Sequence, residues 1–494
     1  MSKKNNNNNN RINNYELNDD VIDNITSTVL KFIQPSTKDS KKVKLIEKKI
    51  IDEIKNYKIP QIIDVQTGGS FAKDTNLKKD MDIDIFILID TNVNEVDFER
   101  IALDVGFKVL KNYAPITRYS EHPYVEGVVK IDKKKEQIRL NIVPCYNVEK
   151  GKWKSAADRS QYHTTYMQKM LKPYQKNQIR ILKAFLKGIG VYGAELSTSG
   201  FSGYVTEVLV LKYGNFKNVI KFIASITREN EIITIDNNYD DEVIIKKFQS
   251  PIIIIDPIDP NRNLGKAISP ESLSRFIYST RAFLKNPSLN FFKIERESNP
   301  KNKDNLLADI DKLLPNILIL EFNFSLRSPD IIWGQLKKLT KSITRLFDDN
   351  EFTTIKSDCY IYDKNYARLV FLLKSTIISP LFEKKGPSVF MANEVFQFVN
   401  KNTDKKNLSV LWITEEMKVT CLNDRKIIDA IKFLEHEIKK EKCNSIGIPR
   451  GLIDDLGRDF KIYTLNKNRI KNKDKQKLVL DFLFKDMKLF GSRY

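Results

Sequence analysis

The sequence has few cysteines, no long apolar run and no excess of negative charge. The four cysteines are Cys145, Cys359, Cys421 and Cys443. Because no two of them form a Cys-x-x-Cys pair, the sequence predicts neither a disulfide framework nor a zinc site. No apolar run approaches the roughly 20 residues of a membrane-spanning helix, and Lys3 and Lys4 lead into a polar stretch unlike a signal peptide. We therefore expect a cytoplasmic protein without a membrane partner.

What the sequence has in excess is positive charge, with 83 Lys and Arg against 63 Asp and Glu and a formal net charge of +20. A lysine-rich composition alone need not shift the net charge, because glutamate can balance lysine. The excess therefore indicates a polyanionic partner, and nucleic acid is favoured over a membrane surface. With 494 residues, the chain is long enough for several folded domains.

The most informative stretch runs from residue 61 to residue 88. Its first part predicts a strand, a tight turn at Gly68-Gly69, and a short helix over Ser70–Leu77 with Ser70 as N-cap. A helix N-terminus after a glycine turn presents free backbone N–H groups and the positive end of the helix dipole. With the Ser70 hydroxyl and the Lys73 ammonium, this turn is suited to binding phosphate.

The second part of the stretch alternates acidic and apolar residues. Asp80, Asp82 and Asp84 fall on one face of the predicted strand, because strand side chains have a period of two. Carboxylates two residues apart on one face repel each other unless a cation lies between them, and magnesium prefers such oxygen ligands. A solvated acidic strand edge is the alternative, but the apolar Phe86–Leu88 that follow are typical of an interior strand. We therefore predict a metal site for nucleotidyl transfer.

The Gly-Ser turn and the Asp-x-Asp strand resemble the DNA polymerase beta-type nucleotidyltransferase superfamily, and residues 69–75 are similar to its archaeal (class I) CCA-adding branch. Further blocks between about residues 20 and 295 carry the narrower resemblance. They are Tyr119–Val125, Ile142–Tyr146, Tyr192–Glu195, Gly200–Tyr204, Asp256–Asp259 and Pro287–Lys293. The resemblance implies template-independent addition of C, C and A to the 3′ end of a tRNA partner, with CTP and ATP as substrates.

The resemblance also implies functional residues. Two magnesium ions would be bound by Asp82 and Asp84, and these residues and Asn141 occupy the catalytic positions. The nucleotide-binding positions are Gly69, Ser70, Lys73, His163, Lys183, Tyr192 and Arg262. Without the resemblance, His163 would more simply be a structural histidine, Lys183 part of a solvated helix face, and Arg262 a partner in a surface salt bridge.

Asn141 is the main departure from the family pattern, which has a third metal-binding aspartate two residues before Val-Pro-Cys-Tyr. Asparagine offers a carbonyl oxygen to magnesium but has no charge and is not a base. Arg139, if it faces the same side, would disfavour a metal further. Three interpretations follow: weaker metal binding with retained activity, compensation by another acid such as Asp80, or an inactive tRNA-binding protein. We favour retained activity, because the nucleotide-binding motifs are kept. Lys73 replaces a family arginine and loses its bidentate fork.

We predict a multidomain α+β protein. A nucleotidyltransferase (polymerase beta-like) head with a mixed sheet is expected at 18–154, a helical middle domain at 155–298, and a ferredoxin-like α/β C-terminal region that binds tRNA at 305–494. Residues 1–17 are expected to form a disordered, Asn-rich tail. The alternative functions are a poly(A) polymerase or other RNA-tailing enzyme and a tRNA-binding pseudoenzyme. The sequence does not determine the oligomeric state and leaves a homodimer open.

Overall fold

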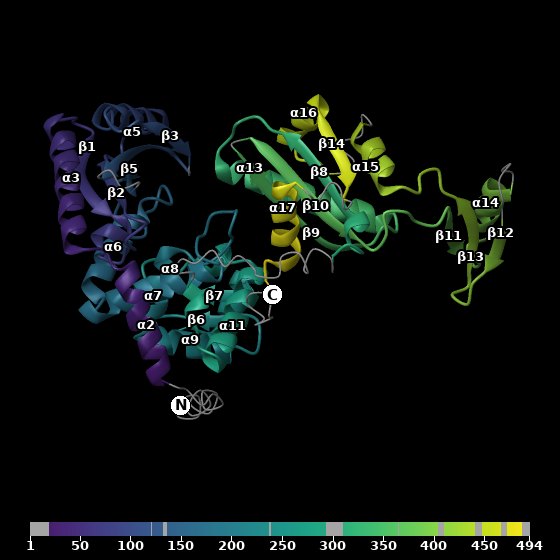
Figure 1. The fold of residues 1–494 in the computed structure, drawn as a ribbon. Helices are drawn as coiled ribbons and strands as arrows, with labels where there is room; N and C mark the ends of the chain where they lie inside the picture. Colours follow the sequence, from purple (N-terminus) through teal and green to yellow (C-terminus); the bar gives the residue numbers. More distant parts are fainter. Residues whose placement is uncertain are drawn as a thin grey trace. The chain divides into compact units, whose positions relative to one another are not determined.

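The computed structural model describes residues 19–119, 121–131, 136–236, 239–292, 310–363, 365–403, 410–439, 447–465 and 472–486. The expected tail at 1–17 and the expected domain boundary at 299–304 lie outside these residues. The chain divides into two compact units, one made mostly of residues up to Ser298 and the other mostly of residues from Asn299 (Figure 1). The first unit holds both the predicted head and the predicted middle domain, so their separation near residue 154 stays a prediction.

The first unit contains a five-stranded mixed sheet with the order β1-β2-β5-β4-β3. Its strands are β1 (Ile62–Gly68), β2 (Asp82–Ile89), β3 (Ile116–Tyr119), β4 (Pro123–Ile131) and β5 (Glu136–Tyr146). Strands β2 and β5 run parallel, and the other neighbours are antiparallel. Helices α3 (Thr37–Asn56) and α5 (Glu95–Val109) pack on the apolar face, which includes Ile83, Ile85 and Ile87 of β2. The sheet therefore leaves its other face to the aspartates of β2. Helix α2 (Asp19–Ile33) precedes α3.

The helix predicted over Ser70–Leu77 is wrong in its bounds. Helix α4 comprises only Gly69–Ala72, and its N-cap is Gly68. Asp74 has a left-handed backbone conformation with φ of 55°, and the hydroxyl of Thr75 donates a 2.6 Å hydrogen bond to buried Glu207. A contact with a residue far along the chain thus ends the helix, and no local pattern encodes it.

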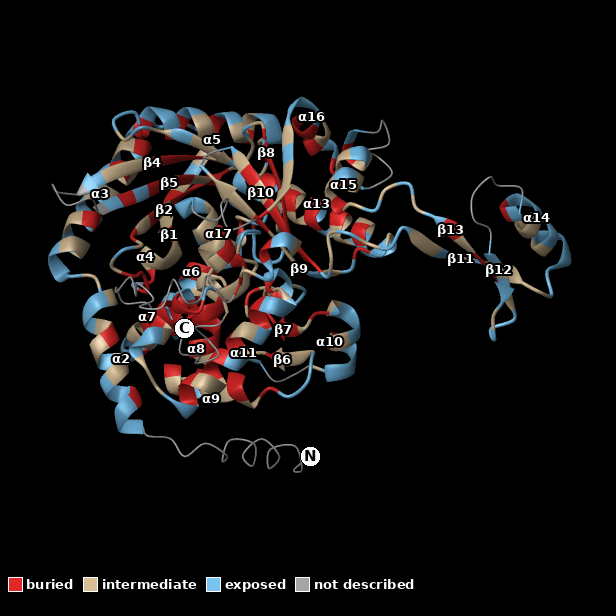
Figure 2. Ribbon diagram, turned by 45° about the vertical axis from the view of Figure 1, so that its right-hand side comes forward, coloured by how far each residue is buried: buried red, intermediate tan, exposed pale blue. Residues whose placement is uncertain are grey.

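The rest of the first unit is mostly helical, as predicted. Its helices are α6 (Arg159–Met170), α7 (Pro173–Gly188), α8 (Gly203–Tyr213), α9 (Phe216–Ser225), α10 (Asp241–Phe248) and α11 (Pro270–Lys285), with short η1 (Leu264–Ala267) and η2 (Leu289–Phe292). A parallel strand pair, β6 (Glu231–Ile233) and β7 (Ile252–Ile254), lies among them. Helices α7 and α8 are buried over much of their surface (Figure 2), and they join one core with α2, α9 and α11. The middle of the unit is therefore a rigid support for side chains on α7 and α8.

The second unit has a ferredoxin-like split βαβ arrangement, as predicted. Its main sheet has the antiparallel order β14-β8-β10-β9, and helix α13 connects β8 to β9. The elements are η3 (Leu314–Asn316), β8 (Ile317–Asn323), α13 (Pro329–Asp349), β9 (Thr354–Tyr362), β10 (Tyr366–Leu373), α15 (Ala430–Lys439), α16 (Arg450–Arg458), β14 (Phe460–Thr464) and α17 (Lys473–Phe484). Helices α13, α15 and α16 share one core with the sheet, and α17 contributes to a second core. Both faces of the sheet are therefore covered.

A smaller sheet is inserted between β10 and α15, with the order β11-β13-β12. It consists of β11 (Leu381–Ser388), β12 (Val410–Ile413) and β13 (Lys418–Asp424), and helix α14 (Ala392–Thr403) packs on it. Across all the described residues, no helix combines the length and apolar character needed to cross a membrane.

Candidate active site

The two aspartates of the Asp-x-Asp motif share one face of β2, and the parallel neighbour β5 places two polar residues beside them. In the strand register, Asp82 pairs with Arg139 and Asp84 pairs with Asn141. The intervening Ile83 is fully buried on the opposite face. The predicted alternation is therefore confirmed for Asp82 and Asp84, whereas Asp80 precedes β2 and is not part of the strand. The position of the expected third carboxylate lies directly beside Asp84.

Asn141 contacts Asp84 but leaves its own carbonyl oxygen unsatisfied. Its Nδ2 donates a 2.8 Å hydrogen bond to Asp84 Oδ1, while its Oδ1 is buried and has no hydrogen-bond partner among the described residues. Burial raises the pKa of the Asp84 carboxyl, and the hydrogen bond from Asn141 opposes that shift. A cation beside Asp84 would stabilise its carboxylate, and the buried amide oxygen of Asn141 could bind that cation as a ligand. The oxygen donors of Asp82, Asp84 and Asn141 therefore fit a divalent cation such as magnesium.

Arg139 faces this site and binds Asp82 in a bidentate manner. Its Nε donates to Asp82 Oδ1 at 2.9 Å, and its terminal nitrogen donates to Oδ2 at 2.7 Å. A cation must therefore compete with a guanidinium for the oxygens of Asp82. Asp80, which the sequence offers as a compensating acid, forms an ion pair with Lys187 instead.

The glycine turn lies against the Asp-x-Asp strand. Gly69 has a φ of +67°, and a Cβ atom built on it would lie 2.0 Å from Asp84 Oδ2. Only glycine fits this position, because a side chain would meet the carboxylate and would also disfavour the backbone conformation. Ser70 follows as the second residue of α4. The predicted phosphate-binding turn and the predicted metal-binding strand are therefore in direct contact.

The two lysines predicted to bind the triphosphate lie close to one buried carboxylate. The Lys73 ammonium donates a 2.5 Å hydrogen bond to Glu207 of α8, and the Lys183 ammonium of α7 lies 3.9 Å from the same carboxylate. Lys183 also donates to the backbone oxygen of Thr75 at 3.0 Å. Its side chain is only 1% exposed, and this burial lowers the pKa of Lys183 to about 8 although Glu207 acts in the opposite direction.

His163 and Arg262 meet at a second buried acid, Asp256. His163 Nε2 donates to Asp256 Oδ2 at 2.8 Å, and Arg262 lies 3.6 Å from the same oxygen. The His163 ring stacks on Tyr204 with 3.9 Å between ring centroids, and Lys73 lies 5.5 Å from the centre of the Tyr204 ring. Burial lowers the pKa of His163 despite the neighbouring carboxylate. The histidine is therefore a neutral hydrogen-bond donor, joined through Tyr204 to the lysine cluster.

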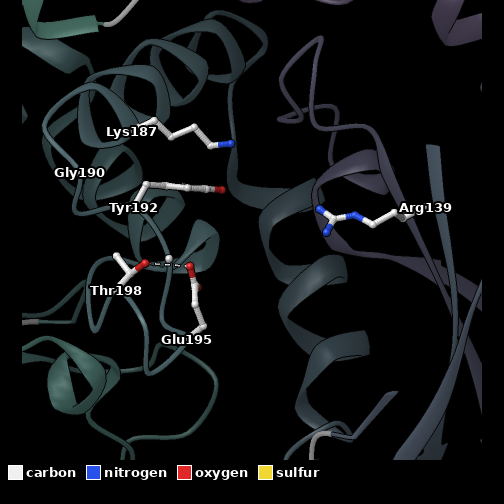
Figure 3. A pocket seen from close by; sticks show the side chains of 7 residues that line it. Arg139, Lys187, Gly190, Tyr192, Glu195 and Thr198 are labelled. Carbon is white, nitrogen blue, oxygen red and sulfur yellow. Dashed lines mark hydrogen bonds between the residues drawn. The ribbon is translucent and has the colours of Figure 1, made fainter. Parts of the chain in front are cut away.

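Tyr192 stands in a cavity of about 500 Å³ with Arg139 on the facing side (Figure 3). Its ring lies 5.2 Å from the Lys187 ammonium, and Glu195 of the same cavity accepts a 3.0 Å hydrogen bond from Thr198. The remaining lining residues are Gly190 and Gly193. The cavity opens beside the Asp82–Arg139 pair and is polar enough for a nucleotide.

The structure places most of the residues that the sequence selected in groups around Asp84, Glu207 and Asp256 and in the Tyr192 cavity, and it adds several that the sequence missed. The additions are polar side chains that contact the predicted ones or their neighbours: Thr75, Glu126, Tyr204, Glu207 and Asp256. Arg139, which the sequence named as a residue that could disfavour a metal, does face the site. One signal was available for Glu207, which is the one charged residue in the mostly apolar stretch Val205–Val210. Acidic residues are rarely buried unless they are paired, so its position already indicated a partner.

Three protein-family descriptions match consecutive parts of the chain. "Nucleotidyltransferase domain" matches residues 47–163, "tRNA nucleotidyltransferase, second domain" matches 177–293, and "CCA-adding enzyme, C-terminal domain" matches 316–464. The three matches together span the mixed sheet, the helical part of the first unit and most of the second unit.

Curated proteins similar to the chain include archaeal CCA-adding enzymes. That of Methanocaldococcus jannaschii is 36% identical over 395 residues, which cover 77% of this chain and 84% of the relative. That of Saccharolobus solfataricus is 34% identical over 409 residues, covering 82% and 90%. Among solved structures, the Cid1 poly(U) polymerase aligns at 14% identity with a TM-score of 0.42, covering 53% of this chain and 92% of that one.

Proposed function

The chain belongs to the family of CCA-adding tRNA nucleotidyltransferases, and from this membership we propose that it completes tRNA 3′ ends by adding C, C and A from CTP and ATP. The observation that carries the proposal is the contact between the glycine turn and the Asp-x-Asp strand, with the unsatisfied Asn141 oxygen beside Asp84. This contact supports the proposal that one point of the fold combines a turn for phosphate with oxygen ligands for a cation.

Asp82, Asp84 and the Asn141 carbonyl oxygen would hold magnesium, for which we propose two ions. When bound, these ions neutralise triphosphate charge and make the attacking hydroxyl more acidic. The protein's own part is to position the ligands. Asn141 aligns the Asp84 carboxylate through its 2.8 Å hydrogen bond, and Gly69 lets the backbone approach that carboxylate.

The triphosphate would lie on the turn at Gly69 and Ser70, within reach of Lys73 and Lys183. Both lysines face Glu207, so an incoming triphosphate competes with a carboxylate that already holds their ammonium groups near each other. Holding the cations in place before binding reduces the entropy lost when the nucleotide binds.

The base and sugar would lie between Tyr192 and the His163–Asp256–Arg262 group. Arg262 presents a fork of donors that suits the acceptor edges of cytosine and adenine, and Asp256 fixes both Arg262 and His163.

In the reaction, the tRNA 3′ oxygen forms a bond to the α-phosphorus while the bond from that phosphorus to the leaving pyrophosphate breaks. The rigid helices α7 and α8 would keep the nucleotide in line for this attack.

We assign tRNA binding to the second unit, on the strength of its match to the CCA-adding C-terminal domain. The formal net charge of +20 supports binding to a polyanion such as tRNA. A homodimer stays a prediction.

The test is incorporation of labelled CTP and ATP into tRNA that lacks its 3′ CCA, with wild type and Asp82→Ala compared over a magnesium series. We expect wild type to add C, C and A and Asp82→Ala to add nothing. Incorporation of ATP alone into arbitrary RNA would favour a tailing enzyme. Tight tRNA binding without incorporation, at high magnesium or manganese, would instead identify a pseudoenzyme.

A further inference from the structure

Glu126 lies in the same row of side chains as Asp84 and Asn141. Strand β4 pairs with β5 so that Glu126 is directly opposite Asn141, just as β2 pairs with β5 so that Asp84 is beside Asn141. Residues opposite each other on neighbouring strands point to the same face. Three adjacent strands therefore present carboxylate, amide and carboxylate in one line across the sheet.

The Glu126 carboxylate is buried but only half engaged. Its side chain is 9% exposed, and Arg118 donates to it through Nε at 3.2 Å and a terminal nitrogen at 2.8 Å. Both of these hydrogen bonds end on the same oxygen, Oε1. No hydrogen bond to Oε2 is found among the described residues, so the second oxygen has capacity for another ligand.

The other candidate acid, Asp80, is less suited to this role. It precedes β2 and forms an ion pair with Lys187, so it does not stand in the row that contains Asn141. Glu126 is one strand farther from Asp84 than Asn141 is, and neighbouring strands lie roughly 4.8 Å apart. The extra methylene of glutamate relative to aspartate can recover part of that distance, but the carboxylate is now turned to Arg118 of β3, so binding the cation requires Oε2 to turn toward Asn141.

We propose that Glu126 supplies the third carboxylate of the cation site, and that Asn141 contributes the neutral oxygen between it and Asp84. The proposal rests on the proposed function, because the cation is the one that nucleotidyl transfer requires. It accounts for how an asparagine is tolerated where the family pattern has aspartate: the negative charge stands one strand away on the same face.

The experiment compares wild type, Glu126→Gln, Asn141→Asp and the double variant in binding of Mn²⁺ alone, followed by electron paramagnetic resonance of the free ion. We expect Glu126→Gln to weaken Mn²⁺ binding by about tenfold or more, and Asn141→Asp to restore it in the double variant. The magnesium concentration for half-maximal CCA addition is expected to follow the same order. Glu149→Gln, at an exposed glutamate paired with Lys152, is the matched control and should change neither.

Arg118→Gln separates this role from a structural one. If Glu126 serves only to hold Arg118, Glu126→Gln and Arg118→Gln will change Mn²⁺ binding equally, and adding Asn141→Asp will restore binding in neither variant. That result would overturn the proposal. Unchanged Mn²⁺ affinity in Glu126→Gln would overturn it as well, whatever the catalytic result. If Mn²⁺ binding depends on Glu126 but wild type adds no nucleotides, the proposal about Glu126 is supported and only the proposed function fails.

Discussion

The ammonium of Lys73 lies 2.5 Å from the carboxylate of Glu207, a residue 134 positions later in the chain. Lys73 follows the glycine turn, and Glu207 belongs to helix α8, so the pair ties the mixed sheet to the helical part of the first unit. Both side chains are buried, with exposures of 7% and 1%. The pair therefore contributes both to the stability of the unit and to the position of a predicted triphosphate ligand.

Glu207→Gln should destabilise the protein substantially, because it leaves the buried ammonium groups of Lys73 and Lys183 without a countercharge. Breaking a buried ion pair costs on the order of 3 kcal/mol or more. Urea unfolding followed by circular dichroism measures the change. Glu229→Gln, at an exposed position, is the control and should change the unfolding free energy by less than about 0.5 kcal/mol. A Glu207→Gln variant as stable as its control would show that the pair contributes nothing to folding.

The unfolding free energy should rise with pH relative to Lys183→Met between about pH 8 and pH 10.5. Burial lowers the pKa of Lys183 to about 8 from its ordinary value of 10.5, so in this window the unfolded chain binds a proton that the folded chain has released. Below about pH 8 both states are protonated, and the difference between the two proteins should be constant. Denaturation at a series of pH values checks this. Lys246→Met, at an exposed lysine, should show no such trend, and a flat difference for Lys183→Met would contradict the lowered pKa.

Arg139→Gln should lower the magnesium concentration that half-maximal CCA addition requires, by several fold. The substitution removes the guanidinium that binds both oxygens of Asp82, at 2.7 and 2.9 Å, and thereby removes the competitor of the cation. The measurement is a magnesium titration at saturating CTP, because Arg139 also lines the cavity that contains Tyr192. Arg100→Gln, which breaks an exposed pair with Asp97, is the control. A higher magnesium requirement in Arg139→Gln would mean that the arginine assists the site.

Gly69→Ala should reduce CCA addition by at least tenfold while the second unit folds normally. The new Cβ would lie 2.0 Å from Asp84 Oδ2, so either the carboxylate or the turn must move, and the φ of +67° adds backbone strain of roughly 1–2 kcal/mol. The rate of incorporation at saturating nucleotide measures the loss. Gly457→Ala is the matched control, because nothing lies within 4 Å of its Cβ and its position in α16 favours alanine. Equal activity of the two variants would refute the close contact.

Local patterns in the sequence were sufficient for the elements that carry the chemistry. The alternation at Asp82 and Asp84 predicts their shared face, because a strand places every second side chain on one side whatever it packs against. The glycine turn was located for a similar reason, although the helix after it is shorter than predicted. Thr75 bonds to Glu207 and draws the chain away from a helical path, and this contact depends on α8.

The sequence by itself determined the motifs, their residue types and the departure at Asn141. Each of these can be read from residues that are one or two positions apart in the chain. Only the tertiary structure decided which acids share a row with that departure. Glu126 and Asn141 are joined by the register of β4 and β5, and Lys73 and Lys183 by a carboxylate on α8. Register and helix packing are set by the burial of whole faces, which brings together residues far apart in the chain, and no short stretch of sequence contains that information.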